Sequence, residues 1–429
     1  MTFNIITFGC KVNQCESENI LENMVRNEFE FVSSFEVADI VIINSCTVTA
    51  ESDRKMRQMI HKVKRKNPHA IIVLAGCMPQ AEPELAKNLE NVDIIVGNSN
   101  KALIVDIIKN HIANHKKVFD VLPIKNIAEF EKTEVNYNPN RSRAFLKIED
   151  GCNRFCSYCI IPYARGKVRS KPLEDIKKDA YNLAENGYKE IVLVGINLSS
   201  YGMDLNCDLA DAVKAVAECK KIKRVRLSSL EPDLMTDELI DKLSKVPKLC
   251  SQFHLALQSG SDKVLESMRR RYTQAEFISV TEKLRKVFPN VTFTTDIMVG
   301  FPGETQADFQ DTLDLIKEVG FLKVHAFPYS IRPGTLAANM ENQIDKSTKS
   351  LRVRKVIEIS EKSAKLVFEN FFGKTLEVLY ETKDSKGYFE GYTSNYIPVK
   401  TKCDCDIRGK IINTKLIKAE DNFCIGELV

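Results

Sequence analysis

The sequence predicts an α/β protein with an N-terminal doubly wound parallel sheet, a central partial (β/α)6 barrel and a small C-terminal β-barrel. Over most of the chain, continuous apolar runs rich in β-branched residues alternate with amphipathic stretches, as in parallel sheets covered by helices. After residue 370 the runs become shorter and alternate in polarity, which is typical of a small all-β barrel. The 429 residues, 44% hydrophobic and 28% charged, suit a globular protein of several domains.

The N-terminal domain is expected to span residues 1–117. Its strands are the apolar runs NIITF, IVIIN and AIIVLA, and amphipathic stretches at Glu16–Asn27 and Glu51–Lys66 are expected to form helices between them. Residues 118–140 show weak periodicity and end in NYNPN, so a linker is predicted there.

Each of the three N-terminal strands is followed by a cysteine: Cys10, Cys46 and Cys77. The carboxyl ends of parallel strands lie along one edge of a sheet, which is where such folds bind ligands. Cysteines far apart in sequence are therefore expected to meet in space. Taken singly, each of these cysteines is best interpreted as a buried structural residue. Three cysteines at equivalent positions instead predict a metal cluster.

The central domain is expected to span residues 141–370. A basic helix closes this domain from Lys346 to Asn370, and helices are also predicted at Leu173–Asn186 and Gln306–Val319. This strand–helix series implies a partial (β/α)6 barrel with its chemistry at the carboxyl ends of the strands. The expected strands begin at Ala144, Ile191, Val225, Phe253, Phe293 and Val324.

The C-terminal domain, residues 371–429, is predicted to be a small β-barrel. It has seven Phe or Tyr residues within its first 26 positions. Basic and aromatic residues on a small barrel suggest binding of single-stranded nucleic acid. Nine Lys or Arg against nine Asp or Glu leave it without net charge, so such binding would depend on local clustering.

A second cysteine set lies just after the first barrel strand. Cys152, Cys156 and Cys159 have the spacing C-x3-C-x2-C and supply three thiolates from one loop. A four-iron cluster takes four ligands, so one iron is left open to hold a cofactor. Thirteen cysteines are too dilute for a disulfide scaffold, and none of the six histidines is paired with cysteines at zinc-finger spacing.

A basic run surrounds this loop. From Arg141 to Lys171 eight Lys or Arg stand against Glu149 and Asp150, which gives a net charge of +6 and suggests binding of a polyanion. The chain has neither a run of apolar residues long enough to span a membrane nor the features of a secretory signal at its start. A cytoplasmic protein without membrane contact is expected.

The stretch GCNRFCSYCIIPYARG resembles the radical S-adenosylmethionine signature. With the strand-end cysteines before it and the small barrel after it, the whole chain resembles the methylthiotransferases, which have an N-terminal methylthiotransferase domain, a radical S-adenosylmethionine barrel and a TRAM domain. TFGCKVNQCES, NSCTVT, GCMPQ, HLALQSGSDKVLESMRRRYT and PYSIRPGT look most like the branch that modifies threonylcarbamoyladenosine. That branch is implied to add a methylthio group to C2 of this nucleoside at position 37, in the tRNA anticodon loop.

The resemblance implies two [4Fe-4S] clusters, S-adenosylmethionine, and an electron donor such as a flavodoxin or ferredoxin. Cys152, Cys156 and Cys159 would bind the radical cluster, and Cys10, Cys46 and Cys77 an auxiliary cluster that holds the sulfur. No catalytic side chain is expected beyond these ligands, because no side-chain base can remove a proton from C2 of adenine. Candidate residues for binding S-adenosylmethionine are Tyr158, Gly195, Asn197, Glu231 and Gln258. Cys15 stands where this branch is expected to have an aromatic residue.

Three alternatives remain open. Sibling branches methylthiolate isopentenyladenosine in tRNA or an aspartate of a ribosomal protein, and the terminal barrel is common to both kinds of substrate. The motif TFGCKVNQ favours a tRNA substrate. A non-catalytic RNA-binding iron–sulfur protein is the third alternative, and the open iron of the cysteine loop argues against it.

Overall fold

A computed structural model describes residues 1–131 and 141–429. The chain divides into two compact units, which are described separately. The first comprises Met1–Asn136, Lys147–Lys171 and Ser330–Ala338, and the second comprises Tyr137–Leu146, Pro172–Tyr329 and Asn339–Val429. The segment Lys147–Lys171, which carries the second cysteine set, thus folds with the N-terminal sheet. A linker was predicted at residues 118–140. Residues 132–140 of that predicted linker lie outside the described residues.

The first unit contains a six-stranded sheet in which every neighbouring pair is parallel. Its order, β2-β1-β3-β4-β5-β6, reverses direction between β1 and β3, which confirms the doubly wound sheet. Residues 118–120, the start of the predicted linker, form the edge strand β6. The strands are β1 (Thr2–Thr7), β2 (Glu30–Phe31), β3 (Ile40–Ser45), β4 (Ile71–Gly76), β5 (Ile94–Val96) and β6 (Val118–Asp120).

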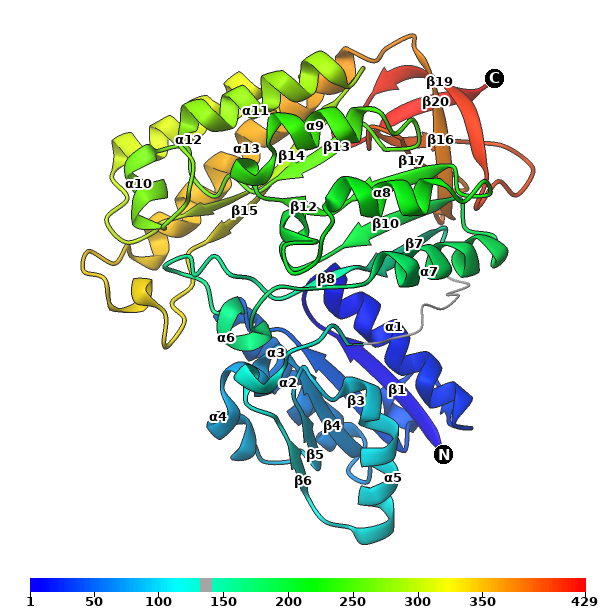
Figure 1. The fold of residues 1–429 in the computed structure, drawn as a ribbon, viewed down its shortest axis with the longest axis vertical. Coiled ribbons are helices and arrows are strands. Elements are labelled where there is room, and N and C mark those ends of the chain that lie inside the picture. Colours follow the sequence, from blue (N-terminus) through cyan, green and yellow to red (C-terminus); the bar gives the residue numbers. More distant parts are fainter. Residues whose placement is uncertain (132–140) are drawn as a thin grey trace. The chain divides into compact units, whose positions relative to one another are not determined.

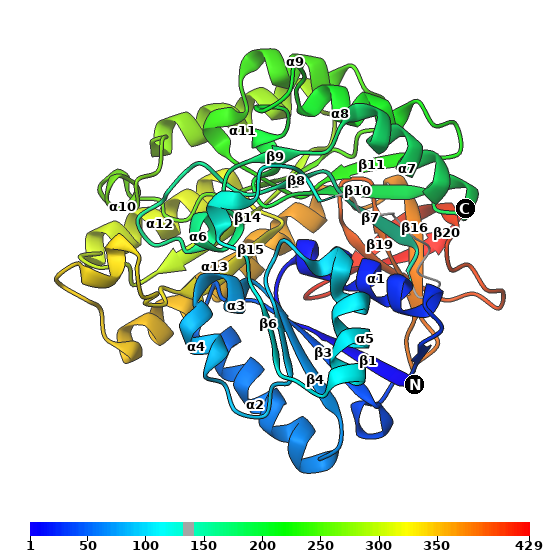
Figure 2. The same cartoon turned by 60° about the horizontal axis from the view of Figure 1, so that its bottom comes forward.

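Helices cover both faces of this sheet (Figures 1 and 2). Successive side chains of a strand point to opposite faces. Ile40 and Ile42 of β3 accordingly pack in a core with Ile20 of α1, whereas Val41 and Ile43 pack with Met56 of α2. The sheet is therefore buried on both sides, which explains its continuous apolar runs. The helices are α1 (Lys11–Arg26), α2 (Ala50–Lys66), α3 (Cys77–Ala81), α4 (Pro83–Lys87), α5 (Ile104–Asn114) and, from the cysteine segment, α6 (Ile161–Arg165).

The second unit contains the partial barrel. Its strands form two sheets, β11-β10-β7 and β12-β13-β14-β15, joined by a bridge between Val225 and Leu249. The pairs β10–β11, β12–β13, β13–β14 and β14–β15 are parallel, as the strand–helix series predicts. The strands are β7 (Arg143–Lys147), β10 (Glu190–Val194), β11 (Arg224–Leu227), β12 (Ser229–Leu230), β13 (Gln252–Leu255), β14 (Thr292–Val299) and β15 (Lys323–Pro328).

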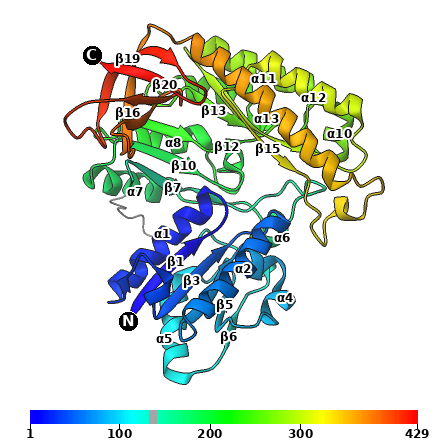
Figure 3. The same ribbon diagram turned by 180° about the vertical axis from the view of Figure 1, so that it is seen from behind.

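Helices alternate with these strands, and the long helix α13 runs along β15 (Figure 3). Reciprocal capping boxes at Asp208, Thr273 and Thr305 fix the first turns of α8, α11 and α12. The helices are α7 (Leu173–Glu185), α8 (Leu209–Ala217), α9 (Asp237–Ser244), α10 (Asp262–Ser267), α11 (Gln274–Val287), α12 (Gln306–Val319) and α13 (Lys346–Glu369). Among the described residues, no helix has the length and apolar character needed to cross a membrane.

The C-terminal residues form a closed five-stranded barrel in the order β16-β17-β18-β20-β19, which confirms the predicted small β-barrel. Tyr380 and Phe389 are buried in its core, so these two rings are not available to stack on bases. The strands are β16 (Thr375–Lys383), β17 (Phe389–Thr393), β18 (Pro398–Thr401), β19 (Ile411–Ala419) and β20 (Cys424–Leu428).

Candidate active site

The three strand-end cysteines lie along one edge of the N-terminal sheet. Cys10 caps the start of α1 after β1, Cys46 follows β3 directly, and Cys77 opens α3 directly after β4. Because β1, β3 and β4 are neighbours in the sheet, their carboxyl ends bring the three residues together. This edge is also the point at which the strand order reverses, where open α/β sheets bind ligands.

Two glycines allow these loops to approach one another. Gly9 has φ +112°, and a Cβ placed on it would lie 2.8 Å from Cβ of Cys46. Gly76 has φ +105°, and a Cβ there would lie 2.6 Å from the carbonyl oxygen of Ser45. Both positions combine a left-handed backbone with a contact that excludes any side chain. The glycines before Cys10 and Cys77 are therefore packing requirements.

The donor set fits an iron–sulfur cluster. Burial and the neighbouring Cys77 raise the pKa of the Cys46 thiol to about 12, so a bound metal must displace its proton. Among the described residues, no three His, Cys, Asp or Glu side chains are grouped as ligands of one metal ion. A cluster takes its thiolates on different irons, so its cysteines stand farther apart than the ligands of a single ion.

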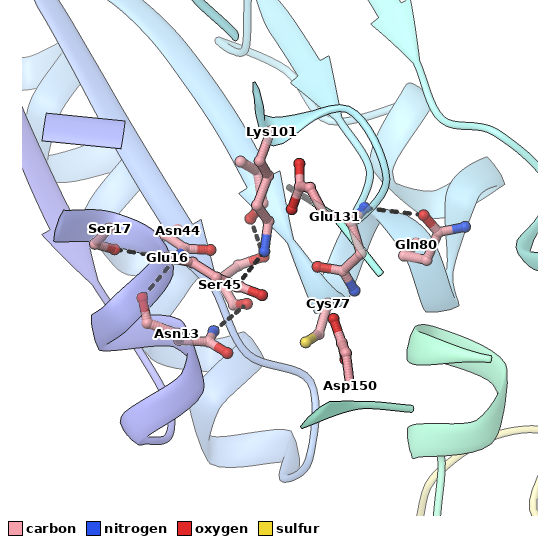
Figure 4. A network of polar contacts seen from close by, with 12 residues as sticks. Asn13, Glu16, Ser17, Asn44, Ser45, Cys77, Gln80, Lys101, Glu131 and Asp150 are labelled. Atoms are coloured by element: carbon pink, nitrogen blue, oxygen red, sulfur yellow. Dashed lines mark hydrogen bonds and ion pairs between the residues drawn. The ribbon is translucent and has the colours of Figure 1, made fainter. Parts of the chain in front are cut away.

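Polar side chains join the loops that carry the cysteines (Figure 4). Asn13 donates from Nδ2 to the carbonyl oxygens of Phe8 and Ser45, both at 2.9 Å. Asn44 donates to the Asn13 carbonyl at 2.9 Å, and Ser45 donates from Oγ to the Ala75 carbonyl at 2.7 Å. These bonds connect the ends of β1, β3 and β4, so the three cysteines are positioned by one network.

The second cysteine loop belongs to the same unit and is closed at its base. β8 (Glu149–Asp150) pairs antiparallel with β9 (Arg169–Ser170), and the Cys152 amide donates to the Gly166 carbonyl at 2.9 Å. Gly151 has φ +91°, and a Cβ there would lie 1.9 Å from the Lys167 carbonyl oxygen. Cys152, Cys156 and Cys159 are half-buried. The loop is thus held while its thiols stay partly accessible.

Tyr158 lies within this loop and is half-buried. The carbonyl of its neighbour Ser157 accepts from the Ala337 amide at 2.8 Å, so the segment 330–338 supports the loop. The other four candidate residues belong to the second unit.

Gly195, Asn197, Glu231 and Gln258 follow the carboxyl ends of β10, β12 and β13, where barrel chemistry is expected. The Glu231 amide donates to Ser199 Oγ at 2.8 Å, and its carboxylate pairs with Arg270. Gln258 has φ +66° and is buried, and its Oε1 has no hydrogen-bond partner among the residues that the structure describes. A buried amide oxygen left without a donor fits a site that receives a ligand.

A group that the sequence did not reveal is a buried set of charges in the first unit. Glu16 accepts from Lys147 Nζ at 2.9 Å and also pairs with Lys101 and Arg165. Burial alone would raise the pKa of Glu16, but these three cations hold it well below its usual range. Lys147 also donates to Asp150 at 2.7 Å. The only signal in the sequence is the charge of these residues, since their partners lie up to 149 positions away.

The structure leaves only half of the expected polyanion-binding run at the surface. Four of its eight cations are buried, and among the described interactions three of these pair with carboxylates in the same unit. Of the eight, Lys167 alone is exposed. The buried residues are Lys147, Arg165, Arg169 and Lys171.

Comparison with protein families gives two matches. The Radical SAM superfamily matches residues 146–316, and an uncharacterized protein family, UPF0004, matches residues 2–97. A solved radical S-adenosylmethionine methyltransferase, TsrM from Kitasatospora setae, superimposes with a TM-score of 0.59 at 12% identity. That match covers 79% of this chain and 77% of the other, and it shows a shared fold.

Three curated relatives align over almost the whole chain. Two are named threonylcarbamoyladenosine tRNA methylthiotransferase MtaB. The one from Bacillus subtilis is 38% identical over 99% of this chain and 95% of its own, and the one from Thermotoga maritima is 40% identical over 92% and 90%. The third, tRNA-2-methylthio-N(6)-dimethylallyladenosine synthase from Finegoldia magna, is 35% identical over 100% and 94%.

Proposed function

Because the chain belongs to the radical S-adenosylmethionine tRNA methylthiotransferase family, we propose that it adds a methylthio group to C2 of N6-threonylcarbamoyladenosine at position 37 of tRNA. As a member of this family the protein uses S-adenosylmethionine and [4Fe-4S] clusters. The observation that carries the proposed substrate is the 38–40% identity to the relatives named for it, over 92–99% of the chain.

The two cysteine sets would hold two clusters. Cys152, Cys156 and Cys159 would leave one iron open for S-adenosylmethionine. Cys10, Cys46 and Cys77 would bind the auxiliary cluster that carries the sulfur, and the two glycine-dependent loops support this assignment. When bound, S-adenosylmethionine supplies the radical that activates the C2 position and the methyl group of the product.

The protein's own residues would bind and orient these groups. Gln258 Oε1 is a buried acceptor that has no donor in the described part of the chain, and it would accept a hydrogen bond from S-adenosylmethionine. At Gly195 and Asn197 the protein backbone would approach S-adenosylmethionine closely, and Tyr158 would pack on the adenine of S-adenosylmethionine. The carboxylate of Glu231 is fixed by its charge pair with Arg270 and would contact S-adenosylmethionine.

The proposed substrate defines the partners. The tRNA anticodon loop would present position 37, and a flavodoxin or ferredoxin would supply the electron that cleaves S-adenosylmethionine. Because tRNA and these electron carriers occur in the cytoplasm, we propose that the protein acts there.

A second candidate substrate is dimethylallyladenosine, also called isopentenyladenosine, since a relative named for it is 35% identical over the full chain. Reconstituted protein should be given two tRNAs that differ in the group at N6 of position 37. Nucleoside mass spectrometry should then find the methylthio product on the threonylcarbamoyl tRNA. Product on the dimethylallyl tRNA alone would refute the proposal and establish the second candidate.

The matched control for this assay is Cys10→Ala. This variant should still form 5′-deoxyadenosine but no methylthio product, and 5′-deoxyadenosine formed by the wild-type protein shows that its radical cluster is assembled. If wild-type protein forms 5′-deoxyadenosine with both tRNAs and methylthiolates neither, the proposed function is wrong.

A further inference from the structure

Arg165 links the two cysteine-bearing segments. It ends α6, six positions after Cys159, and its side chain is 0% exposed. Its Nε donates to Sγ of Cys77 at 3.2 Å, across 88 sequence positions. A fully buried guanidinium must have its donors satisfied, and here one of them is directed at a cysteine of the proposed auxiliary site.

The same guanidinium reaches the other two cysteine loops through one amide. Arg165 Nη2 donates to Asn13 Oδ1 at 2.9 Å, and this oxygen also lies 3.6 Å from Cys10 Sγ, which donates to it as a thiol. Asn13 in turn donates to the carbonyl of Ser45, the residue before Cys46. One buried cation is therefore connected to all three strand-end loops.

Buried charges of both signs hold Arg165 in place. Arg165, Lys147, Lys101 and Arg169 pair with the two carboxylates of Glu16 and Asp150, and all six side chains are almost completely buried. Glu131 adds a further carboxyl that acts on Lys147 and Lys101. Buried ion pairs are costly to break, so this group fixes the guanidinium beside Cys77.

We propose that Arg165 is a positioning residue for the auxiliary cluster: it binds the Cys77 thiolate and raises the reduction potential of the cluster. This inference rests on the proposed assignment of Cys10, Cys46 and Cys77. Hydrogen bonds to cluster sulfurs and net charge set the potentials of iron–sulfur clusters. A fixed cation beside the sulfur stabilises the reduced cluster, which carries one more negative charge.

The test isolates the auxiliary cluster in the full-length chain. Cys152, Cys156 and Cys159 are changed to Ala, and the protein is reconstituted with iron and sulfide. Arg165→Gln, which removes the charge, and Arg165→Lys, which keeps it without the planar fork, are added to this background. Arg169→Gln is the matched control, because Arg169 is a buried cation of the same group that donates to the carbonyls of Arg165 and Lys167.

The readouts are bound iron and the midpoint potential from a redox titration followed by electron paramagnetic resonance. Arg165→Gln should have a more negative midpoint than the background and than Arg169→Gln, with Arg165→Lys in between. If Arg165→Gln instead loses its iron while Arg169→Gln keeps it at an equal melting temperature, the inference is also supported.

Two results would overturn the inference. One is an Arg165→Gln cluster with the midpoint of the background protein. The other is equal behaviour of Arg165→Gln and Arg169→Gln in iron content and potential. If the background protein itself binds no cluster, the proposed auxiliary site fails, and with it the inference; iron that is present with an unshifted potential refutes the role of Arg165 alone.

Discussion

Arg332 donates a hydrogen bond from Nη2 to Oγ1 of Thr47 at 2.7 Å, although 285 positions separate the two residues in the sequence. Thr47 directly follows Cys46. The same guanidinium, 3% exposed, pairs with Asp53 of α2 and with Glu82 at 2.7 Å. The segment 330–338 thus fixes the loop of a proposed cluster ligand from within the first unit.

Arg332→Ala should strongly destabilise the first unit. Removing one partner of a buried ion pair leaves an uncompensated charge and costs about 3–5 kcal/mol. Equilibrium denaturation followed by circular dichroism measures this change. Arg54→Ala is the control, because the Arg54–Glu51 pair on the same helix is about half exposed and should contribute little to stability. Equal effects of the two substitutions would contradict the buried-pair account.

The two cysteine sets should separate two steps of the reaction. Changing Cys152, Cys156 or Cys159 to Ala should abolish both cleavage of S-adenosylmethionine and formation of product, because the radical cluster is lost. Changing Cys10, Cys46 or Cys77 should leave cleavage intact and stop sulfur insertion. Chromatography of 5′-deoxyadenosine and of tRNA nucleosides measures both steps. Full methylthiolation by any variant of the second set would refute the two-cluster assignment.

Gly9→Ala should displace Cys46 and reduce the iron bound at the strand-end cysteines. The new Cβ would meet Cβ of Cys46 at 2.8 Å, and the left-handed backbone adds strain of about 1–2 kcal/mol. Gly187→Ala is a matched control, since Gly187 has φ +93° with open space around its Cβ position. Both variants should lose stability, and only Gly9→Ala should lose iron. Unchanged iron in Gly9→Ala would show that the close approach does not matter.

Asp308 should make the second unit sensitive to acid. Burial alone would raise its pKa, but hydrogen bonds from Thr305 and Ser261 lower it to about 2. This folded-state pKa lies below the value of about 3.9 for an unfolded chain. The stabilisation is therefore present above about pH 4 and is lost as the pH falls through about 2.

Denaturation of Asp308→Asn at pH 7 and at pH 2.5 measures this effect. The variant should be less stable than wild type at pH 7, and the difference should shrink at the lower pH. Asp311→Asn, on the exposed face of the same helix, is the control. A difference that is the same at both pH values would contradict the assignment.

The sequence predicts the elements whose pattern is determined by burial. All six residues of β3 are buried, so its apolar run is continuous and Cys46 at its end could be found. The same reasoning identifies Cys10 and Cys77. The C-x3-C-x2-C spacing of Cys152, Cys156 and Cys159 lies within one short segment, so it can be recognised in the sequence directly. The two short edge strands β2 and β6, with two and three residues, carry too little pattern to be recognised.

The start of α1 and the buried charges were not predictable in the same way. The helix begins at Lys11 rather than Glu16, because Asn13 and Glu16 occupy its buried face and interrupt the apolar period. Charged residues are ordinarily placed on the surface. Arg165 and Lys147 are buried because their partners come from distant segments, which the pattern along a single chain does not contain.

The central claim is methylthiolation of threonylcarbamoyladenosine in tRNA, and mass spectrometry of nucleosides from total tRNA tests it most directly. Cells that lack the gene should be compared with cells that carry it and with cells that carry the Cys10→Ala variant. The account predicts that the methylthio form of threonylcarbamoyladenosine is lost in the first and third strains, while its precursor accumulates. An unchanged level of that nucleoside without the gene would contradict the account.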